Sequence, residues 1–214
     1  MTITAKICGL SDEVAVAAAV EGGAAYVGFV FYPPSPRSVS AARAGQFCAA
    51  VPLGICRVGL FVDADDATIA AVLDAAPLDL LQFHGRESPH RVAEVKVRFS
   101  RPVMKAIPIA APEDVEVAAR YEDTADMLLF DAKPPRRADA LPGGNGLAFD
   151  WRLLAGHQWR LPWMLSGGLT AALLPEAVRI SGASAVDVSS GVELRPGVKD
   201  PNKIRTFLDV ARGL

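Results

Sequence analysis

The chain has 214 residues, 51% of them hydrophobic and 21% charged, a composition that provides a large apolar core and excludes an intrinsically disordered protein. The formal net charge of −2 gives no overall attraction to nucleic acid or to anionic membranes, so neither is expected as a partner. We predict neither a signal peptide nor a membrane span, because no basic stretch precedes a long apolar run and no apolar run reaches about 18 residues. The three cysteines show no metal-type spacing and favour a reducing, cytoplasmic location.

Short apolar runs alternate with helix-like stretches along the whole chain, and eight of these runs are predicted strands. They cover residues 3–7, 25–30, 57–62, 79–82, 103–107, 127–131, 163–166 and 185–188. Helix-start signals lie between them at residues 11–13, Ser40, Asp65, Ser88, Pro112, Thr170 and 200–201, with a short helix over 150–155. Regular alternation predicts parallel strands joined by right-handed crossovers. Eight repeats predict an α/β fold, a single-domain (β/α)8 TIM barrel over residues 1–214.

An open doubly wound sheet is the alternative fold, and it is disfavoured. Such a sheet typically carries a G-x-G-x-x-G motif after its first strand, whereas residues 7–10 here read Ile-Cys-Gly-Leu. In a TIM barrel, chemistry lies at the carboxyl ends of the strands. We therefore take the residues that follow each strand in turn.

The first strand ends with Lys6 and Cys8 on one face and Ile7 on the other. Ile7 suits packing against helices, so Cys8 is expected to face the barrel mouth, as a base, nucleophile or ligand, or simply as a small buried hydrophobe. A thiol with an ordinary pKa of about 8.5 is mostly protonated at neutral pH, so a functional Cys8 requires nearby positive charge or backbone N–H groups. Cys48 and Cys56 do not follow strands and are expected to be structural.

Polar side chains also lie at the carboxyl ends of the second and fourth predicted strands. Arg37 lies on a loop over residues 31–39 that three prolines stiffen, and its planar guanidinium suits a carboxylate or a phosphate, although a surface arginine is the alternative. After the fourth strand, Gln82 and His84 share one face, and His84 is either an acid–base group or a hydrogen-bond donor. Since no second histidine stands nearby, we expect no metal site.

The sixth strand ends in Asp131, after a strongly apolar run. Desolvation there favours a protonated carboxyl that can act as a general acid, the alternative being an ordinary strand-end cap. The segment 132–146 that follows is long for a compact domain and is therefore expected to be functional. Its glycines, among them Gly144 and Gly146, allow the backbone to approach a ligand.

The last two exits are rich in glycine and serine. Gly167 and Gly168 precede a helix start, and Ser190 and Gly191 follow the eighth strand. In barrels of this type these two loops commonly bind phosphate. A thiol, a carboxyl, an arginine and a phosphate site, with no cofactor motif, indicate an isomerisation by proton transfer without a cofactor.

With these residues in place, the chain resembles the phosphoribosylanthranilate isomerase family of tryptophan biosynthesis. The matching pieces, in family order, are residues 6–9, 28–31, 35–37, 58–62, 82–85, 131, 143–146, 149–151, 166–169 and 186–193. One departure is Asn145, where the family often has threonine. Both side chains form hydrogen bonds, so the exchange affects at most one side-chain contact.

The resemblance implies a TIM-barrel isomerase with a small-molecule substrate and no cofactor, expected as a monomer or homodimer. The reaction is the Amadori rearrangement of N-(5'-phosphoribosyl)anthranilate, with Cys8 as general base, Asp131 as general acid and Arg37 on the anthranilate carboxylate. Gln82 and His84 are implied to line the pocket. The remaining implied substrate-binding residues are Gly146 and, around the phosphate, Gly144, Gly167, Gly168, Ser190 and Gly191.

Three alternatives stay open at this point. The related ribosyl-phosphate isomerase of histidine biosynthesis has an aspartate in place of Cys8. Indole-glycerol-phosphate synthase needs catalytic lysines, for which Lys105 is the nearest candidate. A barrel retained only for binding is predicted to lack the acid or the base, whereas Cys8 and Asp131 are both present.

Overall fold

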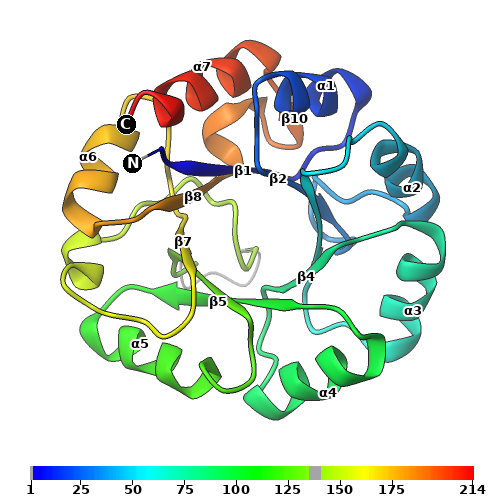
Figure 1. Ribbon diagram of the computed structural model, residues 1–214, viewed down its shortest axis with the longest axis horizontal. Helices are drawn as coiled ribbons and strands as arrows, with labels where there is room; N and C mark the ends of the chain where they lie inside the picture. Colours follow the sequence, from blue (N-terminus) through cyan, green and yellow to red (C-terminus); the bar gives the residue numbers. More distant parts are fainter. Residues whose placement is uncertain (1, 135–140) are drawn as a thin grey trace.

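The computed structural model describes residues 2–134 and 141–214, and its centre is a closed barrel of eight parallel strands (Figure 1). The strands are β1 (Thr4–Cys8), β2 (Tyr26–Val30), β3 (Cys56–Phe61), β4 (Leu80–Phe83), β5 (Val103–Ile109), β6 (Met127–Ala132), β7 (Trp163–Leu165) and β8 (Ala185–Val188). β1 pairs with both β2 and β8, which closes the barrel. The predicted TIM barrel is confirmed, and the open doubly wound sheet is excluded.

The helices surround the strands on the outside, and both termini lie near α6 and α7 (Figure 1). The α-helices are α1 (Glu13–Glu21), α2 (Ala41–Ala49), α3 (Asp66–Ala75), α4 (Pro89–Phe99), α5 (Pro112–Glu116), α6 (Leu174–Ser181) and α7 (Pro201–Arg212). The short 3-10 helices in the described part of the chain are η1 (Val117–Tyr121), η2 (Trp151–Leu154) and η3 (Ser190–Val192). Across the described residues, no helix combines the length and the apolar character needed to cross a membrane.

Side-chain caps begin most of these helices as predicted. Asp12, Ser40, Asp65 and Ser88 each accept a hydrogen bond from the backbone N–H three residues later, which satisfies a donor left free at the helix start. The start predicted at Thr170 is displaced. Its hydroxyl accepts from the N–H of Leu173 in a turn over residues 171–173, and α6 begins only after that turn.

The apolar core has two layers because successive strand residues point to opposite sides. Ile7 and other outward-facing residues pack against the helices. The inward-facing residues fill the barrel itself, in a cluster that includes Val58, Leu80, Met104, Leu129 and Met164. Nearer the mouth, Cys8 packs with Val30 and Leu60. The predicted orientations of Ile7 and Cys8 are therefore confirmed.

A small antiparallel hairpin after β8 was not predicted. It consists of β9 (Glu193–Arg195) and β10 (Val198–Lys199). Gly197 in its turn has a φ of 82° and lies against the backbone of Pro36, so close that a Cβ at this position would overlap the Pro36 carbonyl. The hairpin thus supports the loop that carries Arg37.

Candidate active site

A pocket opens at the carboxyl ends of the barrel strands, where the sequence placed the chemistry. Nearly all the predicted site residues line it, namely Cys8, Arg37, Gln82, His84, Asp131, Gly144, Gly146, Gly167, Gly168 and Ser190. The remaining one, Gly191, is not among the lining residues; it lies against the carbonyl of Leu169, too close for any side chain. Part of the predicted loop 132–146, residues 135–140, lies outside the described residues.

Cys8 sits beside a buried charged network that the sequence did not reveal. Lys6 lies two residues before Cys8 on β1 and is fully buried. It forms an ion pair with Asp187 of β8, with 2.9 Å between Nζ and Oδ1. The Ser166 hydroxyl donates to the other oxygen of Asp187 at 3.1 Å. A Cβ at Gly28 would lie 3.0 Å from Cys8 Sγ and 3.2 Å from Lys6 Nζ. Glycine at this position therefore leaves room for the thiol and the ammonium together.

This network determines the ionisation of Cys8. Burial raises the pKa of the Cys8 thiol, the Lys6 ammonium lowers it by charge and by hydrogen bonding, and the Asp187 carboxylate raises it again. Although Lys199 also lowers it, the pKa of Cys8 lies above its ordinary value. Lys6 thus supplies the positive charge that a functional Cys8 needs, but burial keeps the thiol mostly protonated at neutral pH.

The other two cysteines are placed as expected for structural residues. Cys48 is buried within α2, and Cys56 begins β3 at the opposite end of that strand from the pocket. Burial raises the pKa of each thiol to about 11. Both therefore remain neutral and pack as small hydrophobic side chains.

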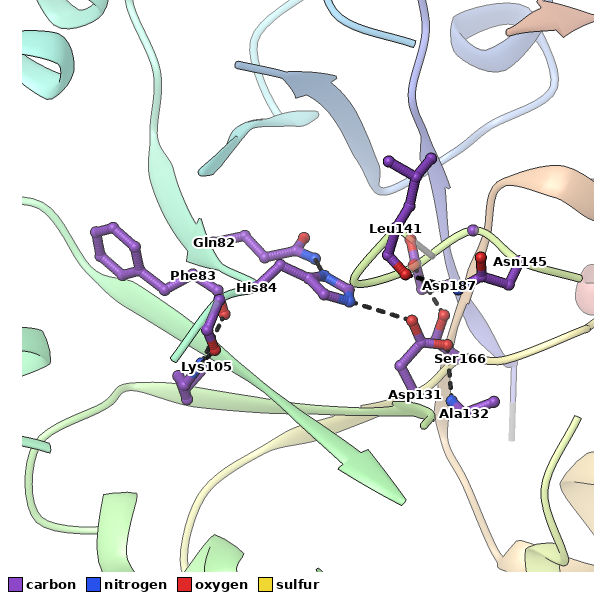
Figure 2. Close-up of polar contacts among 12 residues, drawn as sticks. Gln82, Phe83, His84, Lys105, Asp131, Ala132, Leu141, Asn145, Ser166 and Asp187 are labelled. Carbon is purple, nitrogen blue, oxygen red and sulfur yellow. Dashed lines mark hydrogen bonds and ion pairs between the residues drawn. The ribbon is translucent and has the colours of Figure 1, made fainter. Parts of the chain in front are cut away.

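Asp131 lies one residue before the end of β6, at the pocket, and His84 connects it to Gln82 of β4 (Figure 2). Its Oδ1 accepts a hydrogen bond from the Ala132 N–H at 2.9 Å, and its Oδ2 lies 3.1 Å from Nε2 of His84. The other ring nitrogen of His84, Nδ1, lies 3.1 Å from Nε2 of Gln82. Gln82 and His84 therefore share one face as expected, and His84 links Gln82 to the carboxyl group of Asp131.

Arg37 is held by the hairpin rather than exposed on the surface. Its Nε and Nη2 donate to the two carboxylate oxygens of Glu193 at 2.7 and 3.0 Å, and Nη2 also donates to the Gly144 carbonyl at 3.1 Å. Lys199 donates to Glu193 at 2.9 Å. Burial raises the pKa of Glu193, but Arg37 and Lys199 outweigh it, so that this pKa lies below its ordinary value. Neither Glu193 nor Lys199 was assigned a role from the sequence, and their only signal was charge close to the last strand exit.

The glycine-rich loops meet on the side of the pocket formed by β7 and β8. Gly167 and Gly168 have φ values of 89° and 63°, in the left-handed region that favours glycine. The backbone of Gly168 packs against that of Leu147 and Ala148, next to Gly146. The loops from 143–146, 166–169 and 189–191 are therefore brought together as predicted, although they are far apart in sequence.

Lys105 has a structural position. It is almost fully buried, and its Nζ donates to the Gly85 carbonyl at 2.8 Å and to Glu87 Oε2 at 2.9 Å. Within the described residues, the hydrogen bonds of its ammonium hold the loop that follows β4. This placement argues against the lysine chemistry of indole-glycerol-phosphate synthase.

The fold and the pocket together define a (β/α)8-barrel enzyme. The family model described as N-(5'phosphoribosyl)anthranilate (PRA) isomerase matches residues 5–210. The N-(5'-phosphoribosyl)anthranilate isomerase of Paracoccus denitrificans is 58% identical over 208 residues, which cover 97% of this chain and 96% of the relative. That of Paramagnetospirillum magneticum is 54% identical and covers 100% and 99% of the two chains. The chain therefore belongs to the N-(5'-phosphoribosyl)anthranilate isomerase family and is an isomerase.

Solved structures agree with this assignment. The phosphoribosyl anthranilate isomerase of Thermotoga maritima has a TM-score of 0.88 at 35% identity, with 99% of this chain and 100% of that chain covered. A second structure, with a TM-score of 0.85 at 33% identity and the same coverage, holds a phosphoribosyl anthranilate isomerase in complex with reduced 1-(o-carboxyphenylamino)-1-deoxyribulose 5-phosphate.

Proposed function

We propose that this chain converts N-(5'-phosphoribosyl)anthranilate into 1-(2-carboxyphenylamino)-1-deoxyribulose 5-phosphate, an Amadori rearrangement in tryptophan biosynthesis. The observation that carries the proposal is that Cys8 and Asp131, a candidate base and a candidate acid, line one pocket of a barrel that belongs to this family. Because each step moves a proton, the reaction needs neither a metal ion nor a cofactor.

Asp131 gives its proton to the ribose ring oxygen, so that the bond from this oxygen to C1 breaks and a Schiff base forms. Cys8, as the thiolate, then removes the proton from C2, and the electron pair moves to give an enolamine. The enolamine becomes the ketone when C1 gains a proton and the C2 hydroxyl loses one, which leaves the overall proton count unchanged. The acid and the base thus act in succession within one pocket.

The two charged ends of the substrate have separate partners in this proposal. Arg37 binds the anthranilate carboxylate, and its fixed pairing with Glu193 holds the guanidinium in place before the substrate arrives. The phosphate lies among the backbone N–H groups of the glycine-rich loops, where the glycines permit a close approach. Those loops contribute Gly144, Gly146, Gly167, Gly168, Ser190 and Gly191.

The test is a fluorescence assay of N-(5'-phosphoribosyl)anthranilate consumption by the wild type, Cys8→Ser and Asp131→Asn. A serine hydroxyl is far less acidic than a thiol, and an asparagine amide is far less acidic than a carboxyl group, so each variant should lose roughly 100- to 10,000-fold in kcat. Cys48→Ser, in a helix away from the pocket, is the control and should keep its activity. Near-normal turnover by Cys8→Ser or Asp131→Asn would overturn the role assigned to that residue.

The assembly state and the cellular location belong to the same proposal, as a cytoplasmic monomer or homodimer. Sedimentation of the purified protein over a range of concentrations distinguishes the two states. A stable higher oligomer would contradict the proposal.

A further inference from the structure

Three side chains form an unbroken hydrogen-bonded line at the edge of the pocket, from Gln82 through His84 to Asp131 (Figure 2). Gln82 is fully buried, and both His84 and Asp131 have side chains no more than a tenth exposed. Hydrogen bonds among such groups are poorly screened by water, so a change at one end of the line affects the other. Only Asp131 is used by the mechanism proposed above.

The direction of each hydrogen bond follows from the atoms that face one another. The Gln82 amide nitrogen can only donate, so His84 Nδ1 must accept and carries no proton. The ring proton of a neutral His84 is then on Nε2, which faces Asp131 Oδ2 and donates to it. Gln82 thus fixes the tautomer in which His84 stabilises a negative charge on Asp131.

The orientation of the Gln82 amide leaves its carbonyl oxygen on the side away from the ring (Figure 2). This oxygen, Oε1, is buried and has no hydrogen-bond partner among the described residues. A buried acceptor without a donor is unfavourable, because it has lost its hydrogen bonds to water. Because Gln82 lines the pocket, a hydroxyl or amine hydrogen of a bound substrate can supply the missing donor.

The two oxygens of Asp131 have different surroundings. Oδ1 accepts from the backbone N–H of Ala132, whereas Oδ2 meets the side chain of His84. When Asp131 gives up a proton, negative charge appears on the carboxyl group. A donor already aimed at Oδ2 stabilises that charge without any rearrangement, which lowers the barrier to proton transfer.

From this geometry we infer that Gln82 and His84 are positioning residues for the acid: Gln82 keeps the ring proton of His84 on Nε2, and His84 stabilises the carboxylate that Asp131 becomes on protonating the substrate. The inference rests on the proposed function for its kinetic part only. The tautomer of His84 is a property of the resting protein and can be measured without substrate.

The kinetic test compares His84→Leu, His84→Gln and Gln82→Met with the wild type. His84→Leu should lower kcat by about 10- to 100-fold with little change in KM, since it removes one hydrogen bond to a charged group. His84→Gln should recover much of the loss, because its amide can still donate to Asp131. Gln82→Met should lower kcat less and also raise KM, because Oε1 is lost. His90→Gln, on the exposed face of α4, is the matched control and should leave both constants unchanged.

The spectroscopic test uses protein labelled with 15N at its three histidines, with the His84 signals assigned by their loss in His84→Gln. The ring nitrogens should show a proton on Nε2 in the wild type and a mixture of tautomers in Gln82→Met. A proton on Nδ1 in the wild type would overturn the inference, as would an unchanged kcat in folded His84→Leu. If the wild type failed to turn over the substrate, the proposed function would be wrong. The tautomer measurement would still decide whether Gln82 fixes the ring proton of His84.

Discussion

At the scale of single residues, the ionisation of Cys8 is influenced by two nearby charges of opposite sign. The Lys6 ammonium favours the thiolate and the Asp187 carboxylate disfavours it, while burial opposes ionisation altogether. A base with a raised pKa binds a proton strongly once it is ionised, but it is ionised less often. We therefore expect proton removal by Cys8 to become faster as the pH rises toward the pKa of its thiol.

Substitution of Asp187 and substitution of Lys6 should move the pKa of Cys8 in opposite directions. Asp187→Asn removes the negative charge and frees Lys6 to face the thiol, so the pKa should fall. Lys6→Met removes the positive charge, so the pKa should rise. The ultraviolet absorbance of the thiolate, followed against pH with Cys8→Ser as the blank, measures both. Shifts in the same direction would show that Lys6 and Asp187 do not act on Cys8 through their charges.

The sequence predicted the face on which Cys8 lies, but not the distant residues that pair with Lys6 and Arg37. Strand periodicity places Lys6 and Cys8 on the same side, and this is observed. It does not reveal that Asp187, 181 residues away, neutralises Lys6, or that Glu193, 156 residues away, holds Arg37. Such partners depend on which strands and loops meet after closure, which no local pattern encodes.

At the scale of elements, the β9–β10 hairpin holds the arginine loop. It supplies Glu193 and Lys199 to the buried cluster around Arg37, and Gly197 in its turn packs against Pro36. Ser11 also donates to the Gly197 carbonyl at 3.3 Å, which ties the hairpin to the start of α1. Displacement of the turn should therefore move Arg37.

Gly197→Ala tests this coupling. The new Cβ would overlap the Pro36 carbonyl and would also require an unfavourable positive φ, so Tm should fall and KM should rise several-fold as Arg37 shifts. Gly182→Ala is the matched control, because its φ of 74° is similar and nothing lies near its Cβ. This control should show the fall in Tm, corresponding to about 1–2 kcal/mol, with an unchanged KM. Equal KM values in the two variants would mean that the hairpin does not position Arg37.

Elements with a clear periodicity or cap were predicted closely, and those without one were not. β8 has the predicted bounds, and the other strands differ by one or two residues at their ends. The hairpin was missed because strands of three and two residues are too short to show alternation. The displaced start of α6 reflects a turn after Thr170 that uses the same capping contact as a helix.

At the scale of the whole molecule, the barrel depends on the join between its first and last strands. Lys6 and Asp187 lie opposite each other in the register of β1 and β8, and their buried ion pair spans this join. Burial disfavours the charge on Lys6, but Asp187 and Cys8 outweigh it, so the pKa of Lys6 is above its ordinary value of 10.5. The pair therefore stabilises the fold fully below pH 10.5, and this contribution is lost as the pH rises through the pKa of folded Lys6.

Replacing only one member of the Lys6–Asp187 ion pair should lower the unfolding free energy more than replacing both members. Lys6→Met leaves Asp187 buried without a counter-charge and should cost about 3–5 kcal/mol of unfolding free energy. Lys6→Met combined with Asp187→Leu should recover most of that loss, because no uncompensated charge remains. Urea unfolding at pH 7 measures both, and repeating it above pH 10.5 should narrow the gap between the wild type and the double variant. If the double variant were as unstable as Lys6→Met, the join would depend on shape and packing at these positions rather than on paired charge.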